Sequence, residues 1–165
     1  MKVESFNGRF LEDFKVGDIY RHAVGRTILE VDNTWFTCAT MNTNQIYFNR
    51  HFASLTDYAT PPVNSCFLLA LVNSLTVADT SKNGMVIGWE NVRLPNPAYP
   101  GETIYAQSEV LSVRESQSKP GRGIVKFKTI AGTSEGKIVL TFERTIMVYS
   151  KDTAPVNSVF PEVLA

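Results

Sequence analysis

Hydrophobic and polar residues alternate along the second half of the chain, after the turn-forming sequence Lys82-Asn83-Gly84. A period of two indicates β-strands. Clusters of glycine, proline and serine divide this half into segments and supply turns, two of them short enough for hairpins. The pattern predicts four antiparallel strands, at Met85–Leu94, Thr103–Arg114, Gly123–Ala131 and Lys137–Tyr149.

The segment after Pro61-Pro62 has a different pattern. From Val63 to Val77 it contains neither proline nor glycine, and hydrophobic residues occupy most faces of the helix that it would form. A helix that is hydrophobic nearly all round is buried on most sides. We therefore predict a long central helix over residues 63–77, with Cys66 buried in it as a small hydrophobic residue.

The first half of the chain is less regular. Ile19 to Leu29 alternates roughly and predicts a strand. Asp32 or Asn33 is a suitable cap for a helix, which we expect to bury Cys38, and residues 52–55 suggest a further helical turn. These elements predict a single α+β domain over residues 1–165, with a sheet of about five antiparallel strands around the central helix.

Charge and composition exclude several classes of protein. The 16 basic and 16 acidic residues cancel, so no global field attracts nucleic acid. The longest hydrophobic run, Cys66 to Val72, is far shorter than the roughly 20 residues that span a bilayer. The N-terminus is too polar for a signal peptide. Two histidines and two cysteines without ligand spacing give no metal site and no disulfide framework. We expect a reduced, cytoplasmic protein that binds neither nucleic acid nor membranes and uses no cofactor.

Several motifs, in this order and spacing, resemble the MaoC-like dehydratases, which have the hot-dog fold. The resemblance covers about residues 8 to 150 and is greatest to the single-domain mesaconyl-CoA hydratase-like branch, judged by residues 35–37, 40–43 and 63–65. The segments that carry it are Phe14–Asp18, Ala39–Asn49, Pro95–Pro97, Pro100–Thr103 and Glu109–Ser116.

The resemblance implies a hot-dog fold, at least a homodimer, and the addition or removal of water at the 2,3 double bond of an acyl thioester. In the family an Asp is the base and a His transfers the second proton, but these positions hold Asn42 and Tyr47 here. Asn has no useful acid–base chemistry near neutral pH, whereas Tyr, with a pKa of about 10, is a possible proton donor. The family's thioester carbonyl binds a backbone N–H at the start of the central helix. We therefore expect substrate contacts from Asn44, Val63, Asn64 and Ser65.

Three interpretations of this altered site remain open. In the first, the protein is a hydratase that uses Tyr47 as proton donor and Asn42 to hold water. In the second, the protein binds an acyl-CoA or carrier-bound acyl group without turnover, as a pseudoenzyme or the silent partner of an active paralogue. In the third, the protein catalyses another reaction on a related substrate. The asparagines are also common turn residues, and Tyr47 also suits a core position. His51 is expected at the surface, although one helical turn would bring it near Tyr47, and His22 is expected to be structural or exposed.

Overall fold

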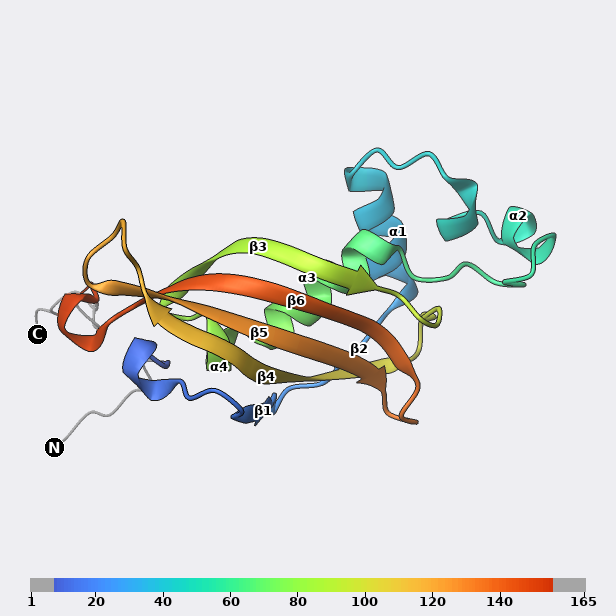
Figure 1. The fold of residues 1–165 in the computed structure, drawn as a ribbon. Helices are drawn as coiled ribbons and strands as arrows, with labels where there is room; N and C mark the ends of the chain where they lie inside the picture. The colour runs from blue at the N-terminus through green and yellow to red at the C-terminus, as the bar shows by residue number, and fades with distance from the viewer. Residues whose placement is uncertain (1–7, 156–165) are drawn as a thin grey trace, which may run out of the picture.

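A computed structural model describes residues 8–155 of the chain, and its centre is one antiparallel sheet (Figure 1). The strand order is β1-β4-β5-β6-β3, and β2 also pairs with β4. The six strands are β1 (Ile19–Arg21), β2 (Arg26–Thr27), β3 (Gly84–Arg93), β4 (Thr103–Glu115), β5 (Arg122–Thr133) and β6 (Ile138–Tyr149).

The four long strands confirm the prediction from alternation, with ends displaced by no more than two residues. The strand predicted over Ile19–Leu29 is wrong in extent. It is two short strands that both pair with β4, and Leu29 is already the N-cap of the next helix. The chain leaves the sheet between these two strands, around Gly25, and so one continuous ladder does not form.

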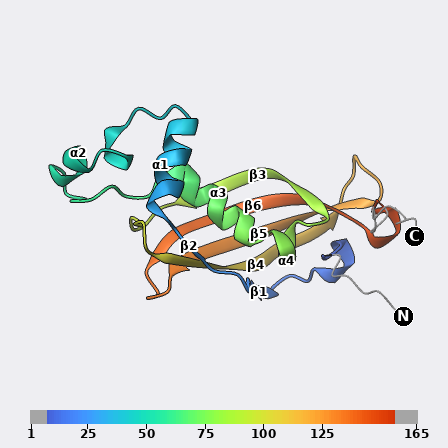
Figure 2. The same ribbon diagram turned by 180° about the vertical axis from the view of Figure 1, so that it is seen from behind.

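The central helix α3 (Ser65–Leu75) lies across one face of the sheet, as Figure 2 shows. It is shorter than the predicted 63–77 span. Asn64 caps its first turn, and at Thr76 the chain turns into the separate short helix α4 (Val77–Thr80). The arrangement of a helix packed on an antiparallel sheet is as expected.

The expectation that α3 is buried on nearly every face is wrong for this chain. Leu68, Leu71 and Val72 are buried against the sheet, but Cys66 and Ala70 are exposed on the other side of the helix. A helix on a single sheet has only one covered side unless another layer is added. The predictions of a buried Cys66 and a buried Cys38 are wrong for the same reason, since both thiols are exposed.

The sheet face beneath α3 also holds a buried arginine, Arg144 on β6, which is fully buried. Its guanidinium donates to Asn73 Oδ1 at 2.8 Å and to Thr80 Oγ1 at 2.5 Å, and so it joins α3 and α4 to the sheet. Burial lowers its pKa to about 10. The alternation of β6 places position 144 on the same face as Phe142 and Ile146, so the arginine faces inward as the period of two requires, although its charge is unusual there.

Three further elements extend beyond one end of the sheet, as Figure 1 shows. They are α1 (Glu30–Ala39), the 3-10 turn η2 (Gln45–Tyr47) and α2 (Arg50–Ser54). Two more 3-10 turns, η1 (Leu11–Asp13) and η3 (Lys151–Thr153), lie at the opposite end. Between residues 8 and 155, none of the helices is long and hydrophobic enough to cross a membrane.

Candidate functional site

Tyr47 lines two pockets. We call the first the α1 pocket; its volume is about 330 Å³, and its lining includes Glu30, Thr34, Arg50, Thr60 and Tyr99. The second, the α3 pocket, has a volume of about 260 Å³, and its lining includes Tyr58, Val63, Ser65, Leu94 and Asn96. Tyr47 is therefore a lining residue of both, and each is large enough for a short acyl group.

Asn33 of α1 fixes the position of Tyr47. Its Nδ2 donates to the backbone carbonyls of Tyr47 at 2.9 Å and Pro62 at 3.0 Å. Its Oδ1 accepts from the backbone N–H of Asn64 at 2.7 Å. One buried amide thus ties α1, the Tyr47 turn and the start of α3 together. The prediction that Asp32 or Asn33 caps this helix is wrong, since α1 begins at Glu30 with Leu29 as its N-cap. The local spacing of Asn33 carries no sign of its long-range contacts.

Asn42 and Asn44, two of the predicted site residues, serve the local backbone. Asn42 Oδ1 accepts from the Asn44 N–H at 3.0 Å, and Asn44 Oδ1 accepts from the Ile46 N–H at 3.3 Å. Asn49 similarly caps α2 through the Phe52 N–H at 3.1 Å. Neither Asn42 nor Asn44 lines the two pockets beside Tyr47. These contacts match the alternative interpretation of Asn42 and Asn44, in which they are turn residues. Their roles in catalysis and substrate binding stay predictions.

The start of α3 contributes Val63 and Ser65 to the α3 pocket. The Asn64 side chain is engaged within the protein: Oδ1 accepts from the Cys66 N–H at 2.9 Å, and Nδ2 donates to Thr37 Oγ1 at 3.1 Å. The Val63 N–H donates to the Ala98 carbonyl at 2.8 Å. Within residues 8–155 the Ser65 N–H has no acceptor. It is therefore a free donor at a helix start, where the backbone dipoles add a partial positive charge.

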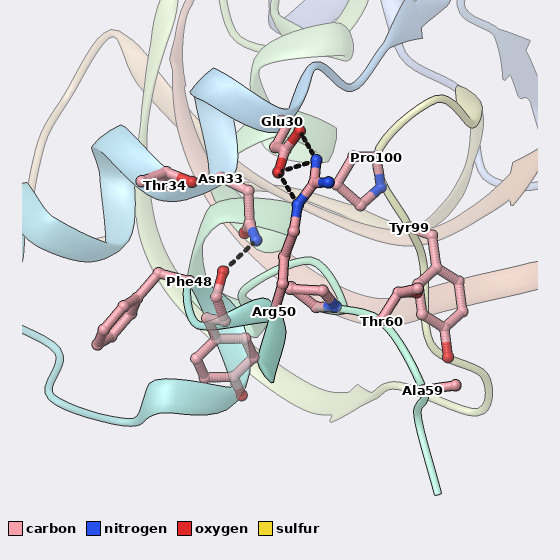
Figure 3. A pocket seen from close by; sticks show the side chains of 11 residues that line it. Glu30, Asn33, Thr34, Phe48, Arg50, Ala59, Thr60, Tyr99 and Pro100 are labelled. Carbon is pink, nitrogen blue, oxygen red and sulfur yellow. Dashed lines mark hydrogen bonds and ion pairs between the residues drawn. The ribbon is translucent and has the colours of Figure 1, made fainter. Parts of the chain in front are cut away.

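The charges of the site belong to the α1 pocket, where Arg50 meets Glu30 (Figure 3). Arg50 Nε and Nη2 donate to Glu30 Oε1 at 2.9 and 2.7 Å, and Nη2 also donates to Oε2 at 2.5 Å. These hydrogen bonds raise the pKa of Arg50. No charged residue of the described chain lines the α3 pocket. Sequence reasoning missed this pair, because 20 positions separate its members and each begins a different helix.

The two histidines lie outside both pockets. His51 is exposed on α2, as expected for a surface histidine. His22 is buried; Nδ1 lies 2.8 Å from Asp79 Oδ2, and Nε2 lies 2.9 Å from Ser108 Oγ. The hydrogen-bonded series of Ser108, His22 and Asp79 resembles the catalytic triad of hydrolases. Ser108, however, is fully buried and lies within hydrogen-bond distance of Thr129. His22 is therefore structural, which is one of the two outcomes that we expected.

The family model described as mesaconyl-CoA hydratase matches residues 3–158 of the chain. The chain belongs to the mesaconyl-CoA hydratase family. Mesaconyl-CoA hydratase of Cereibacter sphaeroides is 30% identical over 148 residues, which are 89% of this chain and 43% of that protein. β-Methylmalyl-CoA dehydratase of Chloroflexus aurantiacus is 29% identical over 166 residues, which are 99% and 46% respectively. This member of the mesaconyl-CoA hydratase family thus spans about half the length of those two relatives.

Solved structures similar to this mesaconyl-CoA hydratase family member confirm the hot-dog fold. A putative MaoC domain protein dehydratase from Chloroflexus aurantiacus superposes with a TM-score of 0.86 and 27% identity, covering 99% of this chain and 47% of that one. A Mycobacterium tuberculosis protein with a double hot-dog fold superposes with a TM-score of 0.81 and 16% identity, covering 98% and 53%. The resemblance to MaoC-like dehydratases that was expected from the motifs is also confirmed.

Proposed function

We propose that this protein adds water to, or removes it from, the 2,3 double bond of an acyl thioester, and that the reaction takes place at Tyr47. The observation that carries this proposal is that Tyr47 lines two pockets, one of which is also lined by residues at the start of α3. The proposal requires the Tyr47 hydroxyl to reach the second carbon of the bound acyl group. Membership of the mesaconyl-CoA hydratase family supports the reaction class.

The proposed mechanism places the thioester carbonyl at the Ser65 N–H in the α3 pocket. During hydration, negative charge develops on that carbonyl oxygen as water adds to the third carbon. A free N–H at a helix start stabilises such charge more in the transition state than in the substrate. This is the only backbone donor of the first α3 turn, among residues 64–67, that has no partner in the described chain.

Tyr47 is the proposed proton donor to the second carbon, and it takes the place that the family gives to a histidine. A tyrosine hydroxyl can donate its proton and so act as an acid in the direction of hydration. Asn42, which lines neither pocket, is the proposed holder of the water molecule, since its Oδ1 has a second lone pair besides the one that accepts from Asn44. The water oxygen bonds to the third carbon, and the proton that the water loses returns to the Tyr47 oxygen, which restores the hydroxyl. Asn44, Val63 and Asn64 would then shape the site through the backbone positions that they fix.

The proposed substrate is an acyl-CoA whose acyl chain is short. The two relatives are named for mesaconyl-CoA and β-methylmalyl-CoA, and both of those acyl groups end in a free carboxylate. Pocket volumes of about 260 and 330 Å³ suit chains of four or five carbons. The test is to add 2-enoyl-CoA of this length to the purified protein and to follow loss of the conjugated thioester's ultraviolet absorbance. No hydration of any such thioester would refute the proposal.

A second candidate is that the protein is the silent half of a two-domain assembly. It is favoured by the residues at the two family positions, Asn42 and Tyr47, and by the length of the relatives, which is about twice that of this chain. In that case the purified protein would bind acyl-CoA without turnover. Adding a related chain that keeps Asp and His would then produce activity that neither protein has alone.

We also propose that a second hot-dog domain, in the simplest case another copy of this chain, pairs along β3. This strand lies at one edge of the sheet, and its exposed residues include Met85, Ile87 and Trp89, with exposed fractions of 65%, 49% and 47%. An exposed, hydrophobic edge strand is a template for pairing. Sedimentation at micromolar concentration should give the mass of a dimer, and Ile87→Lys should shift it towards a single chain. Val24→Lys, at an exposed loop position, should not.

A further inference from the structure

The guanidinium of Arg50 has one side that is not engaged by the protein. Nε and Nη2 both donate to Glu30, whereas Nη1 has no acceptor among residues 8–155. Figure 3 shows the guanidinium between Glu30 and Pro100, within the pocket lining. An arginine offers five N–H donors in a fixed plane, so it can hold one carboxylate at Nε and Nη2 and still donate to a second group through Nη1.

We propose that Arg50 is a specificity-determining residue, which binds a carboxylate at the far end of the acyl chain, and that Glu30 is the positioning residue that holds it. The inference rests on the proposed function, because it places the thioester carbonyl in the α3 pocket. From there the acyl chain passes Tyr47 and enters the α1 pocket. That pocket contains the only positive charge that lines either compartment in the described chain.

The charges of the pocket agree with this assignment. Glu30 balances the charge of Arg50, so the guanidinium is held in place by a pair that has no net charge. The side chains of Arg50 and Glu30 are 76% and 57% exposed, and an ion pair so open to water contributes little to folding. The arrangement in which Nε and Nη2 of Arg50 both donate to Glu30 is thus not needed for the stability of the fold. A planar guanidinium held by one carboxylate is already oriented for another, which lowers the entropy lost on binding.

The alternative is that Arg50 and Glu30 are an ordinary surface pair. Arg26 and Asp32 provide the matched comparison, because Arg26 Nη2 donates to both oxygens of Asp32 at 2.8 Å. That pair lies at the same end of α1 but lines neither pocket. Both arginines are partly exposed, and each holds a first-turn carboxylate of the same helix. The Arg26–Asp32 pair is less exposed, at 44% and 18%, but the difference that the experiment uses is that it does not line the pocket.

The experiment compares fumaryl-CoA with crotonyl-CoA. Their acyl chains have the same four carbons and the same double bond, and they end in a carboxylate and a methyl group respectively. We expect the wild-type protein to prefer fumaryl-CoA. Arg50→Gln should lower the ratio of kcat/KM for fumaryl-CoA over crotonyl-CoA by about fivefold, the effect expected for one exposed charged contact. Arg50→Lys, which keeps the charge and loses the planar donors, should give a smaller loss.

Arg26→Gln should leave the ratio unchanged, and thermal melting should show that all three variants fold. The inference is overturned if Arg50→Gln leaves the ratio unchanged, or if Arg26→Gln lowers it equally. In either case hydration of crotonyl-CoA would still support the proposed function. If neither thioester is hydrated, the proposed function fails, and the dissociation constants of the two thioesters test Arg50 instead. A selective loss of fumaryl-CoA affinity in Arg50→Gln then supports the inference, and equal affinities or no binding overturns it.

Discussion

Asn33 accepts a hydrogen bond from the backbone N–H of Asn64 at 2.7 Å, and this contact links the start of α3 to α1. The same side chain donates to the carbonyl of Tyr47. Asn33 is only 1% exposed, so these hydrogen bonds form away from water. The relative position of Tyr47 and the Ser65 N–H thus depends on one side chain that touches neither the proposed thioester carbonyl nor the proton.

Asn33→Asp should destabilise the protein and displace Tyr47. The aspartate keeps the oxygen that accepts from Asn64, but it replaces two donated hydrogen bonds with a buried negative charge facing the carbonyls of Tyr47 and Pro62. We expect a loss of about 3 kcal/mol in the free energy of unfolding, measured by urea denaturation. Asn49→Asp is the control, because it keeps the helix cap and loses only an exposed hydrogen bond to Gln45 Oε1, and it should change stability by less than about 0.5 kcal/mol. Equal effects of the two substitutions would contradict the role of Asn33.

Tyr47→Phe removes only the hydroxyl from a residue that lines both pockets. If that hydroxyl supplies the proton, the rate of hydration should fall by about a hundredfold to ten-thousandfold. The ring remains, so stability and substrate affinity should change little. Tyr105→Phe is the control, since Tyr105 is 48% exposed and lines neither the α1 nor the α3 pocket. Steady-state kinetics on the same enoyl-CoA measure both variants, and an unchanged rate in Tyr47→Phe would exclude Tyr47 as the donor.

The sheet was predictable from sequence because alternation is a local property, and each long strand repeats it over about ten residues. The exposed side of α3 was not predictable from the sequence, because the same hydrophobic residues suit a helix that is covered on one side and a helix that is covered on all sides. What covers a helix is decided by the elements around it, which the pattern of Cys66 and Ala70 does not specify.

The candidate site was predictable only in part. Tyr47 and Ser65 lie at motif positions, and both line the α3 pocket. Asn33, Glu30 and Arg50 depend on contacts between helices that are distant in sequence, which no local spacing reveals. Asn42 and Asn44 show the opposite case, because motif positions that suggested chemistry also suit turns, and their amides hold the backbone.

The stability of the protein should fall as the pH is lowered through the titration range of His22. Burial lowers the pKa of His22 from its ordinary value of about 6.5, although Asp79 opposes this shift. The unfolded chain therefore binds a proton at a higher pH than the folded one does. The stability provided by the neutral imidazole is present above pH 6.5 and is lost progressively below it, by at most about 1.4 kcal/mol per pH unit.

Urea denaturation between pH 8 and pH 5 measures this effect. His22→Gln should flatten the dependence in that range, although it lowers stability at every pH by disturbing Asp79 and Ser108. The exposed His51 is the matched control, and His51→Gln should leave the slope unchanged. A slope that survives His22→Gln would assign the pH dependence to other groups.

Restoring the family residues, with Asn42→Asp and Tyr47→His together, should raise activity on a 2-enoyl-CoA. The carboxylate supplies the base towards water, and the imidazole supplies a proton near neutral pH. Asp at position 42 still accepts from the Asn44 N–H, so the turn that carries both residues should persist. Each single substitution separates the contribution of its own residue, and thermal melting confirms that all the variants fold.

The outcome of that double substitution decides between the interpretations of the site. Activity in the native protein that rises in the variant supports a hydratase that uses Tyr47 less efficiently than histidine. No native turnover with clear activity in the variant indicates that the native protein binds acyl thioesters without reaction, because the pocket and the Ser65 N–H are then sufficient once the two groups return. If neither protein acts on any enoyl thioester, the pocket serves a different reaction, since the restored groups would meet no substrate that they can hydrate.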